Sequence, residues 1–349
     1  MLTISTSYLV LTLFYLLQVT AKCPERCICS LEEEIDCSNS SMRTFPVGDW
    51  KLMNMSHNSI FSITRYSLRN NFVEVVDISN NVIENIDRTA FMGKLRVKEI
   101  DISLNNIIYI YPETFLFTPN LTSLSLANNR LLELHNGLMF SGNSLKILDI
   151  SYCNISRIEE TTIKYGVSRL QELYLQHNKL EYISCDSFNS LNNLKILNIA
   201  YNNLHSIEVE MFVPLRTLIE LRLENNPVLC DCQLGDIYFW CLTHEIKLEN
   251  MTCVNYERNY RLDWSTHVGM IKCNFKYENQ SMHAKGDRSG DEKTNSEDSD
   301  GLSVVTILVI VAIVIVIICA VIVCACLLNN SHNCCGAIGC GIICVECLY

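Results

Sequence analysis

Apolar residues recur along this chain with a period of about 24 residues. Counted from a recurring asparagine, called N below, apolar residues fall at N−8, N−5, N−3, N+2 and N+5. In one period these residues are Leu194, Leu197, Ile199, Leu204 and Ile207. The asparagine, replaced once by cysteine, marks eight repeats at Asn58, Asn81, Asn105, Asn129, Cys153, Asn178, Asn202 and Asn226.

The alternation at N−5 and N−3 predicts a short strand with one buried face. A single unit cannot bury its own apolar edge, so stacked units are expected to share one core and one parallel sheet. The asparagine amide is expected to bond the backbone of adjacent turns, where water cannot reach. An apolar residue at N+10 predicts a spine under the convex side, formed by Leu68, Phe91, Phe115, Met139, Ile163, Phe188 and Phe212.

Each asparagine closes the same phrase, for example Leu170-Gln-Glu-Leu173-Tyr-Leu175-Gln-His-Asn178-Lys-Leu180. This phrase matches LxxLxLxxNxL, the signature of leucine-rich repeats. The fold class that this resemblance implies is α/β, a leucine-rich repeat solenoid (a horseshoe) with a concave parallel β-sheet.

Cysteine clusters stand at both ends of the repeats, where an open solenoid needs cover for its exposed apolar faces. They resemble the amino- and carboxy-terminal caps of extracellular leucine-rich repeat proteins such as Nogo receptor, Slit, Toll ectodomains and the small proteoglycans. The resemblance covers about residues 22 to 275. It implies the disulfides Cys23–Cys29, Cys27–Cys37, Cys230–Cys253 and Cys232–Cys273. Zinc binding by the two CxC elements is the alternative interpretation.

The ends of the chain predict a membrane protein. An apolar run from Tyr8 to Leu17 predicts a signal peptide cleaved before Lys22, although no Lys or Arg precedes it. Residues 303–328 are apolar and uncharged, which is long enough for one transmembrane helix. Six glycosylation sequons precede that run, at Asn39, Asn54, Asn120, Asn154, Asn250 and Asn279.

These features predict a single-pass type I protein of the plasma membrane, with its N-terminus extracellular. The expected segments are a signal peptide (1–21), an N-terminal cysteine cap (22–49), eight repeats (50–226), a C-terminal cysteine cap (227–275), a flexible stalk (276–302), a transmembrane helix (303–328) and a cytoplasmic tail (329–349). The tail has no Lys or Arg, against the positive-inside rule, but the signal peptide and sequons outweigh it. A glycolipid anchor attached near Gly301 is the alternative.

The tail is rich in cysteine and too short to hold a signalling domain. Thiols close to the inner leaflet predict acylation at Cys324, Cys326, Cys334 and Cys335. Zinc binding through Cys344 and Cys347, with Cys335 and Cys340, is one alternative, and unmodified thiols are another. Three ectodomain cysteines fall outside the caps. Cys153 is expected to be buried and inert, while Cys185 and Cys241 are expected to form an extra bridge or a disulfide-linked homodimer.

Side chains at N−4, N−2 and N−1 are expected to point onto the concave face. In repeats five to eight they predict a binding patch of Asp149, Tyr152, Tyr174, His177, Tyr201 and Arg222. Tyrosine and arginine are favoured interface anchors. A solvated polar face with incidental tyrosines is the alternative. A glycan at Asn54 would argue against the first repeat as a contact.

No glycine-rich phosphate loop, HExxH or nucleophile elbow is present in the sequence, so an enzyme and a cofactor are not expected. A formal net charge of −11 opposes nucleic-acid binding. We therefore expect a cell-surface adhesion molecule or co-receptor for an extracellular protein ligand. The alternatives are an innate-immune recognition or decoy receptor for microbial products, and a structural matrix protein held at the membrane.

Overall fold

A computed structural model describes residues 23–30, 33–68, 72–131, 134, 138, 140, 144–163, 166–249, 252–255, 260–263 and 273. The predicted signal peptide, stalk, transmembrane segment and tail lie outside these residues. The chain divides into two compact units, residues 1–288 and 289–349, and every described residue belongs to the first. Among the described residues, no helix has the length and apolar character needed to cross a membrane.

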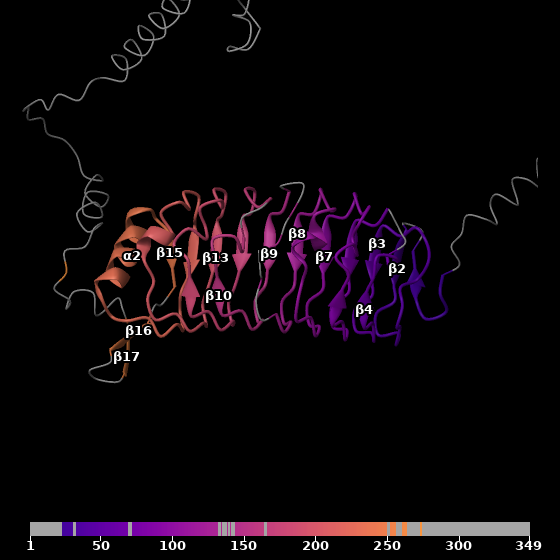
Figure 1. Cartoon of the computed structure of the whole chain (residues 1–349), viewed down its shortest axis with the longest axis horizontal. Helices are drawn as coiled ribbons and strands as arrows, with labels where there is room; N and C mark the ends of the chain where they lie inside the picture. The colour runs from indigo at the N-terminus through magenta and orange to yellow at the C-terminus, as the bar shows by residue number, and fades with distance from the viewer. Residues whose placement is uncertain are drawn as a thin grey trace, which may run out of the picture. The chain divides into compact units, whose positions relative to one another are not determined.

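The described chain is organised by an 11-stranded sheet with the strand order β1-β2-β3-β5-β7-β8-β9-β11-β13-β14-β15 (Figure 1). Its strands are β1 (Ile28–Cys29), β2 (Glu34–Asp36), β3 (Leu52–Asn54), β5 (Val75–Asp77), β7 (Glu99–Asp101), β8 (Ser123–Ser125), β9 (Ile147–Asp149), β11 (Glu172–Tyr174), β13 (Ile196–Asn198), β14 (Glu220–Arg222) and β15 (Lys247–Leu248). Strands β1 and β2 pair antiparallel, and the other neighbours pair parallel. The register is set by the buried N−5 residue, so that Leu173 lies opposite Leu148 and Leu197. The predicted concave parallel sheet is therefore present.

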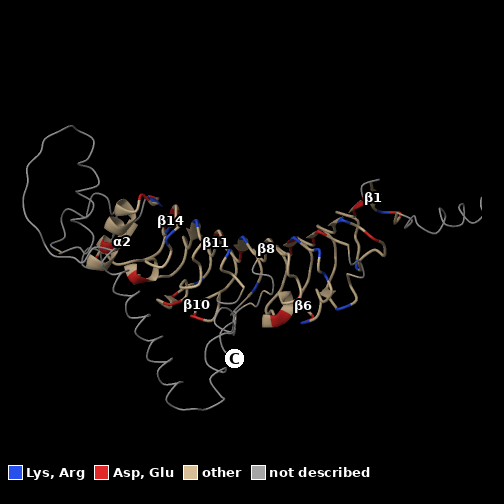
Figure 2. Ribbon diagram, turned by 90° about the horizontal axis from the view of Figure 1, so that it is seen from above, with Lys and Arg blue, Asp and Glu red and all other residues tan. Residues whose placement is uncertain are grey.

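The opposite side of the solenoid consists of short strands and turns. Strand β4 (Ser62–Ile63) pairs with β6 (Asn85–Ile86), and β10 (Arg157–Ile158) pairs with β12 (Tyr182–Ile183). Two 3₁₀ helices, η1 (Pro112–Phe115) and η2 (Val209–Met211), complete it. Figure 2 shows β6 and β10 across the solenoid from β8, β11 and β14.

The expected α/β class needs correction, because α2 (Cys232–Thr243) is the one α-helix among the described residues. The architecture is a β-solenoid. Each repeat of about 24 residues must cross the sheet, turn, run along the convex side and return. Few residues remain for a helix, and a single helical turn gains little because its nucleation is costly.

The core lies between the two sides and contains the apolar repeat positions, which are almost completely buried. The phenylalanine spine is visible as stacked rings: Phe91 and Phe115 have centroids 5.5 Å apart, and Phe115 and Phe140 have centroids 6.1 Å apart. In the fourth repeat, Phe140 therefore occupies the spine at N+11, one residue after the predicted Met139, which lies outside the described residues. An aromatic ring at this point continues the stack started by Phe91.

The recurring asparagines form the predicted ladder. In Asn105 the Nδ2 group donates to the carbonyl oxygens of Ile102 (3.1 Å) and Ser103 (3.0 Å) in its own turn. It also donates to the Ile78 oxygen of the preceding repeat at 3.1 Å, and Oδ1 accepts from the Ile83 N–H at 2.9 Å. Contacts to both repeats recur at Asn58, Asn81, Asn129, Asn178, Asn202 and Asn226. Each amide thus satisfies buried backbone groups in two repeats at once.

Cys153 interrupts this ladder. Its Sγ lies 3.5 Å from the Leu126 oxygen and 3.4 Å from the Ser151 oxygen, which are long, weak contacts. The backbone N–H of Leu131 faces sulfur, whereas an amide oxygen accepts from the equivalent N–H in the other repeats, as at Ile83 and Ile107. The thiol is buried, and burial raises its pKa to about 11, so it stays protonated at neutral pH. The expectation of a buried thiol at Cys153 is confirmed.

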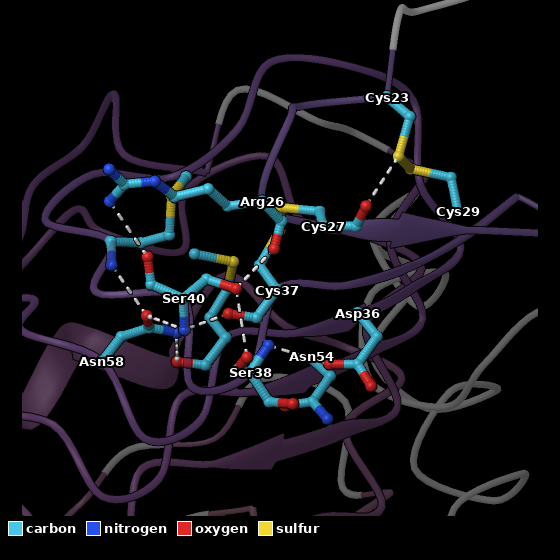
Figure 3. The surroundings of a disulfide bond; sticks show 12 residues. Cys23, Arg26, Cys27, Cys29, Asp36, Cys37, Ser38, Ser40, Asn54 and Asn58 are labelled. Atoms are coloured by element: carbon cyan, nitrogen blue, oxygen red, sulfur yellow. Dashed lines mark hydrogen bonds between the residues drawn. A yellow bond between two sulfur atoms is a disulfide. The ribbon is translucent and has the colours of Figure 1, made fainter.

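Disulfides hold the cap at the amino-terminal end. The bonds Cys23–Cys29 and Cys27–Cys37 tie β1 and β2 together (Figure 3). The first asparagine of the ladder bonds to the segment that follows this cap: Asn58 Oδ1 accepts from the Ser40 N–H at 3.1 Å and from the Met42 N–H at 2.7 Å. Ser40 Oγ donates to the Arg26 oxygen at 2.5 Å (Figure 3). The cap thereby continues the backbone ladder of the repeats.

Helix α2 covers the core at the carboxy-terminal end. Asp231 caps it by accepting from the Leu234 N–H at 3.1 Å, and Trp240 stacks on the spine ring of Phe212 with centroids 6.1 Å apart. Disulfides Cys230–Cys253 and Cys232–Cys273 fasten the helix to the segments that follow. Strands β16 (Thr252–Asn255) and β17 (Tyr260–Asp263) form an antiparallel pair there. All four disulfides join the pairs that the cap resemblance implies.

Replacing Cys153 with asparagine should stabilise the solenoid. The Cys153→Asn variant restores an acceptor for the Leu131 N–H and donors for two carbonyls, each bond contributing about 1 kcal/mol net. We expect the free energy of unfolding to rise by about 1–2 kcal/mol, measured by urea denaturation. The matched control is Asn129→Cys, which copies the sulfur into the preceding repeat and should destabilise by about 1–3 kcal/mol. Unchanged stability in both variants would contradict the ladder as a source of stability.

Gly166 should tolerate no side chain. Its φ is +73°, and an added Cβ would lie 2.0 Å from the Phe140 carbonyl oxygen. Gly93 also has a positive φ (+80°), but no atom lies within 4 Å of a Cβ added there. Gly93→Ala should therefore cost only the left-handed backbone strain, about 1–2 kcal/mol, and Gly166→Ala should cost clearly more in the same denaturation experiment. Equal losses would show that the close approach at Phe140 does not matter.

Candidate functional site: the concave face of repeats five to eight

The residue before each ladder asparagine adopts a left-handed backbone conformation, which the sequence analysis did not foresee. The φ values lie between 52° and 58° at His57, Asn80, Leu104, Asn128, Tyr152, His177, Tyr201 and Asn225. This geometry lets each N–H reach the next repeat: that of Tyr152 donates to the Gln176 oxygen at 2.9 Å, and that of Tyr201 to the Glu224 oxygen at 2.8 Å. The N−1 side chains therefore follow one another at every repeat.

Three consecutive N−1 side chains form an aromatic ladder, defined here as Tyr152, His177 and Tyr201. The ring centroids of Tyr152 and His177 are 4.1 Å apart with planes inclined by 13°. Those of His177 and Tyr201 are 4.2 Å apart with planes inclined by 14°. The stack is open to solvent, since Tyr152 is 47% exposed and Tyr201 is 46% exposed.

The aromatic ladder carries a backbone cost. A left-handed conformation disfavours bulky side chains by about 1–2 kcal/mol, whereas asparagine and histidine adopt it more readily. Asparagine occupies the same position at Asn80, Asn128 and Asn225. The left-handed turn recurs at all eight N−1 positions, so it belongs to the scaffold. Tyr152, Tyr201 and Leu104 are the residues at N−1 that are neither asparagine nor histidine.

Acidic side chains at N−6 hold two of the predicted patch residues. The Tyr174 hydroxyl donates to Glu172 Oε2 at 2.8 Å. Burial, followed by this bond to Glu172, raises the pKa of Tyr174 to about 12, so the phenol stays protonated. Arg222 Nε lies 2.5 Å from Glu220 Oε1, and Lys247 Nζ lies 3.5 Å from the same oxygen.

Residues at N−6 were not among the predicted patch residues, although the repeat pattern indicates them. Side chains alternate along a strand, so if N−5 and N−3 face the core, then N−6 and N−4 both face the concave surface. Glu172 and Glu220 are the members of this column that anchor Tyr174 and Arg222.

The carboxylate of Asp149 has a structural contact. Its Oδ1 accepts from the Ser151 N–H at 2.9 Å, two residues further on. The same bond occurs at Asp77 (2.9 Å) and Asp101 (2.8 Å). The acidic character of N−4 in the amino-terminal half therefore reflects a local turn motif, in which Asp and Asn oxygens close the bend after each strand.

The remaining cysteines behave differently from one another. Cys185 is exposed, and its thiol donates to Glu208 Oε2 at 3.2 Å, a bond that raises its pKa. Cys241 is buried in helix α2, and burial raises its pKa to about 12. The expected pairing of Cys185 with Cys241 is absent, as both thiols are free. The prediction that Cys241 takes part in an intermolecular disulfide is also wrong, because its thiol is buried on the side of helix α2 that faces the core.

The predicted modification sites are placed only in part. Asn39 and Asn120 are exposed, while Asn54 and Asn154 are half-buried. Asn54 Oδ1 accepts from the Ser56 N–H at 3.0 Å, in the turn motif described for Asp149. Asn250, Asn279 and the four acylation candidates lie outside the described residues. Within the described part of the chain, no cluster of His, Cys, Asp and Glu is arranged to hold a metal ion.

The repeats of this chain are similar in sequence to those of known proteins. A "Leucine rich repeat" family model matches residues 73–131 and 168–228, and a second matches residues 144–165. Podocan from Mus musculus is 30% identical over 256 residues, covering 64% of this chain and 37% of podocan. Human oligodendrocyte-myelin glycoprotein is 25% identical over 210 residues, covering 51% of this chain and 46% of the glycoprotein. Human Toll-like receptor 8 is 31% identical over 205 residues, covering 56% of this chain and 20% of the receptor.

The chain thus spans less than half the length of each of these relatives. The family models match within the repeats, where the parallel sheet and the asparagine ladder also lie. The repeats of this chain, closed by disulfides at both ends of the solenoid, are therefore leucine-rich repeats.

Proposed function

We propose that the protein is a cell-surface adhesion molecule or co-receptor that binds an extracellular protein ligand through the concave face of repeats five to eight. The observation that carries the proposal is the aromatic ladder, three stacked rings that remain open to solvent on a rigid sheet. Large aromatic side chains held in this way are typical anchors of protein interfaces.

The ladder is organised before any ligand arrives. Each ring is restrained by its neighbour at about 4 Å, and each backbone position is fixed by a bond to the next repeat. Binding therefore costs little side-chain entropy, which is the main penalty that flexible surface residues incur. Pre-organised rings favour a partner that presents an apolar or aromatic side chain of its own.

Charged groups on the strands of repeats six to eight and on β15 suit a protein partner. Glu220 is shared between Arg222 and Lys247, and Glu172 is bonded to Tyr174. Both signs of charge are therefore present within a few strands of the rings. Such mixed polar groups contribute mainly to orientation and specificity. The relatives include a glycoprotein and a receptor by name, which supports a role at the cell surface.

Membrane attachment belongs to the same proposal. Residues 303–328 are proposed to form the single transmembrane helix of a type I protein, with acyl chains on Cys324, Cys326, Cys334 and Cys335.

Replacing the two tyrosines with asparagine should separate binding from folding. Tyr152→Asn and Tyr201→Asn introduce the residue found at N−1 in three other repeats, so the fold and the surface level should be retained. Loss of an aromatic anchor should weaken binding by about 2 kcal/mol, or roughly 30-fold. The measurement is binding of a partner, found by screening extracellular proteins, to cells that display the full-length chain.

Tyr66→Asn and Tyr182→Asn are the matched controls, because these tyrosines are 70% and 46% exposed outside the concave face. Core substitution should act differently: Leu173→Ala should cost about 2–5 kcal/mol of stability and lower the surface level. If the control variants lose binding while the ladder variants retain it, the ligand binds elsewhere.

Antibody accessibility should report the topology. An epitope tag after Lys22 should be detected on intact cells, while a tag after Tyr349 should require permeabilised cells. Glycosidase treatment should lower the apparent mass, because the sequons lie on the outer side. Detection of the carboxy-terminal tag on intact cells would contradict type I anchoring.

A further inference from the structure

A second surface feature lies at the edge of the sheet where the strands begin. In repeats five to eight, each repeat places one basic side chain there: Lys146, Arg169, Lys195 and Arg216. We call these four residues the basic edge. They occupy N−7, N−9, N−7 and N−10 of their repeats, and all four are exposed.

The backbone holds Lys146 and Lys195 at equivalent positions on the strand edge, whereas Arg169 and Arg216 stand two and three residues before that position in their repeats. The N–H of Lys146 donates to the Thr122 oxygen at 2.8 Å, and the Lys146 oxygen accepts from the Gln171 N–H at 2.8 Å. The Lys195 N–H continues this ladder to the Gln171 oxygen at 2.7 Å. Neighbouring strands lie about 4.8 Å apart, so the four charges are spread over about 15 Å on a rigid support.

The basic edge carries a net positive charge on an acidic protein. Residues 143–146, 168–171, 192–195 and 216–219, which are N−10 to N−7 of the four repeats, contain no Asp or Glu, while the whole chain has a formal charge of −11. Among the described residues, none of the four basic side chains forms a salt bridge. Lys98, two repeats before Lys146, shows the contrast, since it is paired with Glu74 at 2.7 Å.

Neutral hydrogen-bonding groups fill the rest of this edge. Gln171, Asn192 and Thr217 stand between the basic residues, and Asn192 and Thr217 are exposed. Lys and Arg bind sulfate and carboxylate groups through charge-assisted hydrogen bonds. Amide and hydroxyl side chains add contacts to sugar hydroxyls.

We propose that the basic edge binds a sulfated glycosaminoglycan. A linear polysaccharide with anionic groups at regular intervals matches cations contributed one by each of four consecutive repeats, with amides and hydroxyls between them. A single-stranded nucleic acid fits less well, because such ligands need aromatic platforms for base stacking, and the four segments of this edge contain no aromatic residue.

This site is separate from the aromatic ladder. N−7 and N−1 stand on either side of the strand, six residues apart, or about 20 Å of extended chain. The site also has a boundary: Asn120, at N−9 of repeat four, is an exposed sequon residue, so a glycan there would flank the polysaccharide without covering repeats five to eight. Protein ligand and polysaccharide can therefore be bound together, and each proposal can fail alone.

Binding of the purified full-length chain to immobilised heparin, over a series of salt concentrations, tests the proposal. The variant carries Lys146→Gln, Arg169→Gln, Lys195→Gln and Arg216→Gln. The control carries Arg43→Gln, Arg65→Gln, Arg130→Gln and Lys179→Gln, which removes four exposed charges elsewhere and gives the same net charge. A poly(uridylate) RNA of similar length is measured in parallel.

The natural chain should bind heparin with an affinity that falls steeply with salt, as counterion release from a polyanion requires. The basic-edge variant should lose at least tenfold in affinity and show a shallower salt dependence, while the control stays within about twofold of the natural chain. Equal losses in variant and control would overturn the site, since only net charge would then matter. RNA binding as tight as heparin binding would overturn the choice of polysaccharide.

Discussion

The solenoid depends on keeping every buried backbone group hydrogen-bonded at the bend that follows each strand. The chain turns inward there, and its N–H and C=O groups leave the ladder of the sheet in a place that water does not reach. In every repeat but the fifth, a single asparagine amide resolves this, as Asn105 does by bonding to its own turn and to the preceding repeat. Since each bond set joins two repeats, the same contact that satisfies the bend also fixes the stacking, and stacking is what gives a repeat its stability.

That constraint also explains how the concave surface acquires its character. For the asparagine to point inward, the residue before it must turn through the left-handed region, as Tyr152 and Tyr201 do. The turn brings consecutive N−1 side chains to a separation of about one strand spacing, which is the distance at which rings stack. The scaffold therefore supplies a ready column, and the sequence decides whether that column is polar, as at Asn80 and Asn128, or aromatic.

Much of this arrangement could be predicted from periodicity alone. The strand positions, the buried asparagines and the exposed tyrosines follow from a repeated pattern in which each residue type agrees with its neighbours in other repeats. The errors occurred where the pattern is silent. Phe140 stacks on Phe115 in the spine and was not predicted there, because a one-residue shift changes no count of apolar residues. Cys241 is buried because of how helix α2 lies on the core, which depends on tertiary packing and leaves no trace in cysteine spacing.

The sulfur at Cys153 makes the interface between the fourth and fifth repeats weaker than the other interfaces between repeats. In a stack held by nearest-neighbour contacts, separation begins at the most weakly bonded interface. The fourth and fifth repeats share backbone bonds as the other repeats do, but at the asparagine position they have only long sulfur contacts in place of amide bonds. Heat or a pulling force would open the protein there, leaving a carboxy-terminal block that keeps its own ladder residues and its cap. The aromatic ladder and the basic edge both lie in that block. The four carboxy-terminal repeats, with both of these surfaces, would thus stay folded after the amino-terminal repeats have unfolded.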